Sequence, residues 1–134
     1  MHIDLGLVLE FSHPGDHTQV ILEDRYGQLA KIVSSDGLQV KINSKFSLPN
    51  QLRFILKNID SQSASVTLKS LILGGLPLPQ HIIEQICCFS PTDSMHSIFS
   101  HCWTQDGKVI IDFFAGDWVQ YHLLYGNKIT FENL

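Results

Sequence analysis

Ile98-Phe-Ser-His-Cys-Trp-Thr104 and Val109-Ile-Ile-Asp-Phe-Phe114, separated by Gln105-Asp-Gly-Lys108, are the stretch that decides the fold. Both runs are rich in aromatic and β-branched residues, and Asp-Gly tolerates the positive backbone angles of a two-residue type I′ turn. The spacing therefore predicts a β-hairpin. Pairing outward from that turn places His101 opposite Asp112, so that an imidazole and a carboxylate lie side by side on an apolar sheet face.

The strand after this hairpin has two possible registers. If Gly116-Asp117 is a two-residue turn, Asp112 faces Tyr121 and extends the row that begins at His101. If Ala115-Gly-Asp117 is a three-residue turn, Tyr121 moves to the opposite face of the sheet. The pairing of His101 with Asp112 is the same in both registers.

A carboxylate beside an imidazole fixes the tautomer of the histidine and suits it to act as a general base or a hydrogen-bonding ligand. His101 and Asp112 are therefore the candidate catalytic residues of a small hydrolase or lyase. Such an enzyme also needs a nucleophile or an activated water, and the sequence has no Gly-x-Ser-x-Gly motif. A structural contact between the two side chains is favoured, because buried polar groups usually have partners.

Composition indicates one globular domain over residues 1–134. Hydrophobic residues make up 44% of the chain and charged residues 16%, so a core can form without disulfides or metals. The net charge is −4, and the nine lysines and arginines are scattered singly along the sequence. We therefore expect no nucleic acid and no membrane as partners. The first residues lack the pattern of a signal peptide, which predicts a cytoplasmic protein.

The cysteines carry little functional signal. There are three, two of them adjacent as Cys87-Cys88. An odd count cannot complete a disulfide framework, and adjacent cysteines lack the spacing of a redox pair. The sequence therefore predicts reduced and buried thiols.

Regular turn signals elsewhere in the chain predict further strands. Residues 3–11 and 38–42 alternate between apolar and polar side chains, which is typical of half-buried strands. Residues 20–23 and 29–33 flank the turn-forming sequence Asp24-Arg-Tyr-Gly27. Short strands at this spacing predict an all-β antiparallel sandwich.

Two further segments complete the predicted architecture. Residues 52–57 and 64–73 are separated by a polar loop and are predicted to pair as a second hairpin. The alternation in the latter is lost after Leu68, which predicts a bulge or a change to burial on both faces. Residues 80–88 have isoleucines at helical spacing and predict one short helix that caps an end of the sandwich.

Aromatic residues gather in the last part of the chain. Nine of the 13 lie from Phe89 onward. Flat aromatic faces beside hydrogen-bonding groups offer a platform for a sugar ring or a partner protein. The candidate ligand-binding residues are Trp103, Trp118, Tyr121 and Tyr125. The phenylalanines predicted to lie in the core are Phe99, Phe113 and Phe114.

A metal site is a weaker possibility. His13, Asp16 and His17 place three potential ligands within five residues, around a Pro-Gly bend. A structural zinc site needs four ligands and a catalytic one usually three plus water, so another group would have to come from elsewhere. A solvated polar loop is favoured, and no metal or other cofactor is expected.

Leu71-Ile-Leu-Gly-Gly-Leu-Pro-Leu-Pro79 ends the second predicted hairpin and carries a family resemblance. An amphipathic strand, a polar loop and a strand ending in Leu-x-Gly-x-x-Leu resemble a segment of jelly-roll carbohydrate-binding modules and of small viral or phage sandwich domains. The resemblance covers less than a quarter of the chain and implies a jelly-roll-like sandwich. Such modules often carry a calcium site of clustered Asp and Asn and exposed aromatic side chains, and only the aromatic side chains have counterparts in this sequence.

These observations predict a non-enzymatic binding or interaction module that engages a glycan or a protein partner through an aromatic sheet face. Apolar residues on both faces of the C-terminal strands predict a homodimer. The first alternative is the small hydrolase or lyase that uses the histidine and the aspartate. The second is a structural or accessory component of a viral or mobile-element assembly.

Overall fold

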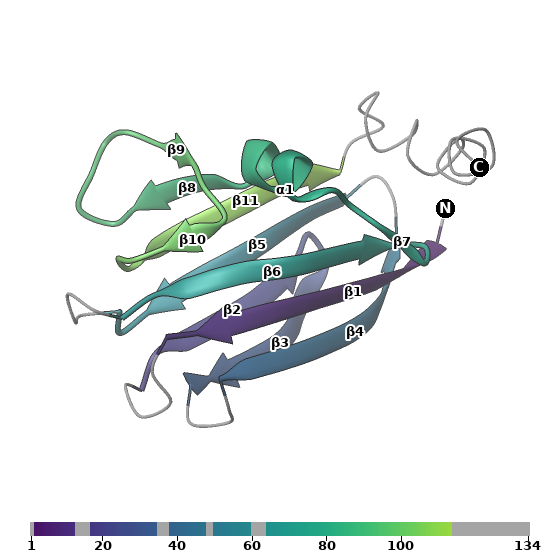
Figure 1. The fold of residues 1–134 in the computed structure, drawn as a ribbon, viewed down its shortest axis with the longest axis horizontal. Helices are drawn as coiled ribbons and strands as arrows, with labels where there is room; N and C mark the ends of the chain where they lie inside the picture. Colours follow the sequence, from purple (N-terminus) through teal and green to yellow (C-terminus); the bar gives the residue numbers. More distant parts are fainter. Residues whose placement is uncertain (1, 13–16, 35–37, 48–49, 60–63, 114–134) are drawn as a thin grey trace.

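The structure, a computed structural model, describes residues 2–12, 17–34, 38–47, 50–59 and 64–113. In this part of the chain two antiparallel β-sheets lie face to face, and one short helix lies at their side (Figure 1). The predicted fold class, an all-β antiparallel sandwich with one short helix, is confirmed.

Each sheet draws its strands from several parts of the sequence. Sheet A has the order β10-β6-β1-β4, with β7 paired to β6, and sheet B has the order β3-β2-β5-β11-β8-β9. The chain changes sheets repeatedly instead of forming a run of hairpins, which is the jelly-roll-like feature of the fold. The elements in chain order are β1 (His2–Phe11), β2 (Gln19–Asp24), β3 (Gly27–Val33), β4 (Gln39–Ser47), β5 (Asn50–Lys57), β6 (Val66–Leu73), β7 (Leu76–Pro77), α1 (Gln80–Ile86), β8 (Cys88–Pro91), β9 (Ile98–Phe99), β10 (Cys102–Trp103) and β11 (Gly107–Phe113).

Alternating side chains build the core between the sheets. In β1, Leu5, Leu7 and Leu9 point inward and are buried, and the residues between them lie on the outer face. In β5, Leu52 and Phe54 do the same from sheet B. Burial of such side chains contributes roughly 1.5–3 kcal/mol each, so this period-two pattern fixes which face of each strand is inside.

The predicted hairpin over residues 98–114 is wrong. β10 pairs with β6 in sheet A, whereas β11 pairs with β5 and β8 in sheet B. Asp106 lies where the chain crosses between the sheets, and its Oδ1 accepts a hydrogen bond of 2.7 Å from the backbone N–H of Ile59. The crossing lets Trp103 of sheet A pack on Phe54 of sheet B, with ring centroids 5.5 Å apart. A hairpin would instead place this tryptophan in the same sheet as β11.

The second predicted hairpin is wrong for the same reason, because β5 belongs to sheet B and β6 to sheet A. The predicted bulge in residues 64–73 is confirmed. Val8 of β1 is opposite Ser70 and Leu9 is opposite Leu68, so β6 has one extra residue at Lys69. The tight turn between β2 and β3 also forms as predicted.

The helix α1 falls within the predicted residues 80–88 and links β7 of sheet A to β8 of sheet B. Ile83 is buried, and Ile82 and Ile86 pack against the core from the same helix. The part of the chain that the structure describes contains no helix of the length and hydropathy that crossing a bilayer requires.

The three cysteines are free thiols in different surroundings. Cys87 is buried, and burial raises the pKa of its thiol to about 12. Cys88 is half-buried and Cys102 is exposed. The prediction of buried thiols is therefore right for Cys87 and wrong for Cys102.

Candidate binding site

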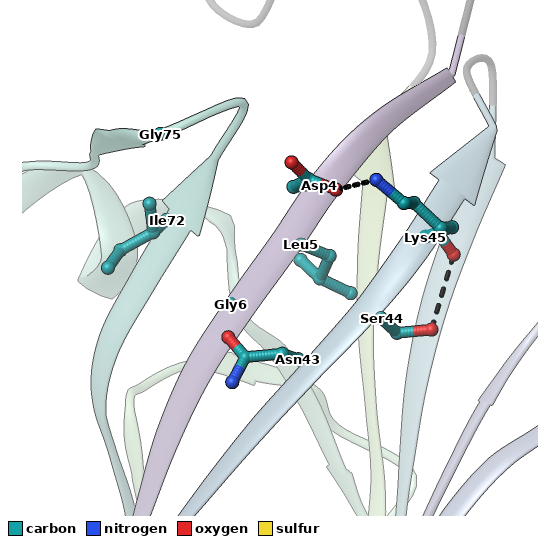
Figure 2. A pocket seen from close by; sticks show the side chains of 8 residues that line it. All are labelled: Asp4, Leu5, Gly6, Asn43, Ser44, Lys45, Ile72 and Gly75. Carbon is teal, nitrogen blue, oxygen red and sulfur yellow. Dashed lines mark hydrogen bonds and ion pairs between the residues drawn. The ribbon is translucent and has the colours of Figure 1, made fainter.

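A hollow of about 530 Å³ lies on the outer face of sheet A, across β1, β4 and β6 (Figure 2). Its volume is within the range of about 300–1,000 Å³ that small-ligand sites occupy. It is open to solvent, and we refer to it as the Gly6 hollow. Its lining residues are Asp4, Leu5, Gly6, Asn43, Ser44, Lys45, Ile72 and Gly75.

The strand register and one missing side chain create the Gly6 hollow. Gly6 of β1 is opposite Asn43 of β4 and opposite Ile72 of β6, so the three residues share the outer face. A Cβ atom at Gly6 would lie 3.3 Å from Oδ1 of Asn43 and 3.7 Å from Cβ of Ile72. The glycine therefore leaves open the space that any other side chain would occupy.

Polar groups line one side of the hollow. Asp4 and Lys45 are opposite each other on β1 and β4 and form an ion pair (Figure 2). Their side chains are 71% and 81% exposed, and exposed pairs contribute only about 0–1 kcal/mol to stability. Both can therefore turn toward a ligand at little energetic cost. The side-chain amide of Asn43 makes no hydrogen bond within the described residues, and it offers both donors and an acceptor.

A further hollow adjoins the Gly6 hollow on sheet A. This second hollow of about 450 Å³ is lined by His2, Ile3, Asp4, Lys45 and Gly74. It shares two residues with the Gly6 hollow, so the two form one surface beside the ion pair. An elongated ligand would have room along it.

The predicted catalytic pair does not form. His101 lies between β9 and β10, with its Nδ1 3.6 Å from Oε1 of Glu84 in α1. Asp112 lies on the outer face of sheet B, where its Oδ1 accepts a hydrogen bond of 2.8 Å from Nε2 of Gln51. The predicted pairing of the two is wrong because it depended on the hairpin of residues 98–114, whose strands lie in different sheets.

Of the four residues predicted to form an aromatic platform, only Trp103 lies among the described residues, and its position does not support the platform. Trp103 is completely buried, and its Nε1 donates a hydrogen bond to the carbonyl of Ser100. It is a core residue because the crossing between sheets turns it inward. Trp118, Tyr121 and Tyr125 lie outside the described residues.

The three phenylalanines predicted to lie in the core have different outcomes. Phe113 is buried as predicted, and Phe114 lies outside the described residues. The prediction for Phe99 is wrong, since its side chain is 66% exposed on the edge strand β9. Tyr26, at the turn between β2 and β3, is 73% exposed.

Of the comparisons with other proteins, only the one with solved structures finds similar chains. The sequence matches no protein-family model and no curated protein. Two solved structures are similar. The structure of vCBM60 in complex with galactobiose has a TM-score of 0.59 and 12% identity, covering 81% of this chain and 97% of that chain. The fold resembles that of vCBM60.

The second similar structure is a selenomethionine form of vCBM60, with a TM-score of 0.59 and 11% identity, covering 82% of this chain and 90% of that chain. The description of that structure states that circular permutation provides an evolutionary link between two families of calcium-dependent carbohydrate binding modules. At these identities the likeness establishes the fold. The resemblance to carbohydrate-binding β-sandwiches that the sequence suggested is therefore confirmed for the fold.

The calcium dependence named in that description has no counterpart among the acidic, histidine and cysteine side chains of the described residues. No group of three or more His, Cys, Asp or Glu side chains among them could hold a metal ion. Asp24 and Asp106 accept hydrogen bonds from backbone N–H groups, and Asp4 is paired with Lys45. Of the predicted metal ligands, His17 is exposed, and His13 and Asp16 lie outside the described residues.

Sequence reasoning missed the Gly6 hollow. Its signal was an isolated glycine within an alternating strand, which often marks a close approach or an open space. The glycine alone does not reveal which side chains surround it. Asn43 and Ile72 lie 37 and 66 residues further along the chain, and only the register of three strands brings them to Gly6.

Proposed function

We propose that this chain is a non-enzymatic glycan-binding module, and that the glycan lies in the Gly6 hollow. The fold supports the general class, because vCBM60 has a similar fold and its structure is in complex with galactobiose. A fold does not locate a binding site, so the position is argued from the geometry of this chain. The observation that carries it is an open hollow, with polar groups along one side, created by a glycine on a sheet face.

The residues around the hollow match the chemistry of a sugar. A sugar presents hydroxyl groups that both donate and accept hydrogen bonds, and C–H faces that are apolar. Asn43 can donate and accept, Asp4 accepts and Lys45 donates. Ile72 provides an apolar surface on the other side of the glycine. Among the described residues no aromatic ring lines this hollow, so hydrogen bonds and close fit would dominate the affinity.

The structure does not support the alternative of a hydrolase or lyase. It required His101 and Asp112 to share one groove, whereas they contact Glu84 and Gln51 at separate places. Binding by the hollow needs no proton transfer and no nucleophile. The proposed function is therefore binding without catalysis.

Filling the hollow tests this proposal. Gly6→Val adds a side chain that strands accommodate well and that occupies the space between Asn43 and Ile72. Calorimetric titration with a panel of galactose-, glucose-, xylose- and mannose-based oligosaccharides should find one that binds. Gly6→Val should then weaken its affinity by at least about tenfold, or about 1.4 kcal/mol.

A matched control separates filling of the hollow from the general effect of adding a valine to this face. Thr67→Val also introduces valine on the outer face of sheet A, at the far end of β6 from the hollow. It should leave the affinity unchanged, and circular dichroism should show both variants folded. Equal affinity of Gly6→Val and the unchanged protein, or a panel without any binder, would reject the proposal.

A further inference from the structure

The outer face of sheet B carries a second surface, which the glycan site on sheet A does not use. Strand pairing places Ile21 of β2 opposite Ile55 of β5, and both are half-buried on the outer face. Lys31 of β3 is opposite Ile21, and Lys108 of β11 is opposite Ile55. Lys57 lies two residues beyond Ile55 on the same face of β5. Two isoleucines therefore form an apolar floor with lysines around it.

These three lysines differ from the two lysines of sheet A that are paired with acidic residues. Lys31, Lys57 and Lys108 are exposed and form no ion pair within the described residues. By contrast, Lys45 is paired with Asp4 and Lys69 with Glu10. The sheet register thus brings these scattered lysines to one surface, where they form no ion pair within the described residues. We call the group of Lys31, Lys57, Lys108, Ile21 and Ile55 the lysine-rimmed face.

The strand geometry sets the size of this face. Neighbouring strands are about 4.8 Å apart, and Lys31 and Lys108 are separated by three such steps, or about 14 Å. Lys57 lies one strand and two residues from Lys108, or about 8 Å. Long, flexible side chains at these separations can reach successive charges on one extended chain.

We propose that the lysine-rimmed face binds an anionic polysaccharide, whose carboxylates or sulfates contact the three lysines while its sugar rings lie on the two isoleucines. The C–H side of a sugar ring packs on an apolar floor, and its charged substituents lie at the ring's edge. The face offers both features in the same arrangement. This inference rests on the charge and register of sheet B and does not depend on the Gly6 hollow.

The charges on the chain argue against a second copy as the occupant. Face-to-face association requires complementary charge, since like charges in contact cost several kcal/mol. The outer face of sheet A also carries more lysine than acid, because Lys41, Lys45 and Lys69 face only Asp4 and Glu10 there. Nucleic acid is a poorer match, because the five residues of the lysine-rimmed face include no aromatic ring on which a base could stack.

The test compares two charge-matched triple variants. K31Q/K57Q/K108Q removes the three charges of the rim and keeps polar side chains there, and R25Q/K41Q/K69Q removes the same number of charges elsewhere. The probes are polygalacturonate, heparin, a neutral galactan, polyglutamate and vesicles of phosphatidylcholine with phosphatidylserine, each measured by biolayer interferometry at about 50 and about 200 mM salt. Polygalacturonate and heparin distinguish carboxylate from sulfate recognition.

We expect one or both acidic polysaccharides to bind more tightly than the other probes. Their affinity should be lower at about 200 mM salt than at about 50 mM salt. The rim variant should lose at least about tenfold in affinity, and the control variant less than about twofold. Gly6→Val should retain this binding, which separates it from the glycan site. The proposal is overturned if neither acidic polysaccharide binds, if both triple variants weaken alike, or if polyglutamate or the vesicles bind as tightly.

Discussion

The indole Nε1 of Trp103 donates a hydrogen bond of 2.7 Å to the carbonyl oxygen of Ser100, and the indole is completely buried. Its ring packs on Phe54 of the opposite sheet. One side chain therefore joins the crossing segment, sheet A and sheet B. This arrangement makes Trp103 a residue of stability and not of ligand binding.

Trp103→Ala should accordingly destabilise the protein by about 4 kcal/mol, as large-to-small substitutions in cores do. Phe99→Ala is the matched control, because Phe99 is 66% exposed and its loss should cost less than about 0.5 kcal/mol. Urea unfolding followed by far-ultraviolet circular dichroism measures both. Equal midpoints for the two variants would show that Trp103 is not in the core.

Gly107 is required by close packing against β8. A Cβ atom there would lie 2.4 Å from the carbonyl oxygen of Ser90 and 2.9 Å from Cα of Pro91, both backbone atoms. Gly107→Ala should therefore cost about 3 kcal/mol in urea unfolding, at the upper end of overpacking effects. Gly6→Ala, whose Cβ would meet only side-chain atoms at 3.3 Å or more, should cost less. The reverse order of stability would contradict the packing described here.

A buried polar pair holds the turn between β2 and β3. Oδ1 of Asp24 accepts hydrogen bonds from the N–H groups of Tyr26 and Gly27, and its Oδ2 accepts one of 3.2 Å from Nδ2 of Asn50. Asp24→Ala leaves those donors without their acceptor and should cost about 1–3 kcal/mol. In a double-mutant cycle with Asn50→Ala, the coupling should be about 1 kcal/mol. Additive effects in thermal unfolding would mean that the two residues act independently.

Cys87 makes stability depend on alkaline pH. Burial raises the pKa of its thiol from 9.0 to about 12, so above pH 9 the unfolded chain loses this proton while the folded chain keeps it. The unfolded state is then favoured, and the contribution of Cys87 falls by up to about 1.4 kcal/mol per pH unit between those values. Cys87→Ala removes this titration.

The measurement is the difference in unfolding free energy between the unchanged protein and Cys87→Ala at pH 8, 9, 10 and 11. We expect the difference to be constant up to about pH 9 and then to move in favour of the variant. A difference that stays constant over the whole range would contradict a raised thiol pKa.

The sequence predicted the local features of this fold and missed those that depend on distant pairing. The alternation of residues 3–11 and 38–42 is a local pattern that predicts strands, and the first range lies in β1 while all but Leu38 of the second lies in β4. The Asp-Gly signal at residues 106–107 misled, since Asp106 bonds to Ile59 and Gly107 is needed for contact with β8. Turn chemistry alone does not reveal whether the next strand joins the same sheet.

The candidate sites show the same contrast between local patterns and pairing of distant strands. The pairing of His101 with Asp112 was inferred from one assumed turn and failed with it. The Gly6 hollow and the lysine-rimmed face each combine residues from three or more strands, and such sets are visible only once the register is known. Homodimerisation, cytoplasmic location and the organisation as one domain stay predictions.

The central claim is that a glycan binds in the Gly6 hollow. Its most direct test is to follow backbone amide chemical shifts by NMR during titration with the oligosaccharide that binds best. We predict that the shifts of Gly6, Asn43 and Ile72 change together and saturate, while those on the outer face of sheet B stay constant. Shifts that gather elsewhere, with these three residues unchanged, would contradict the proposed site.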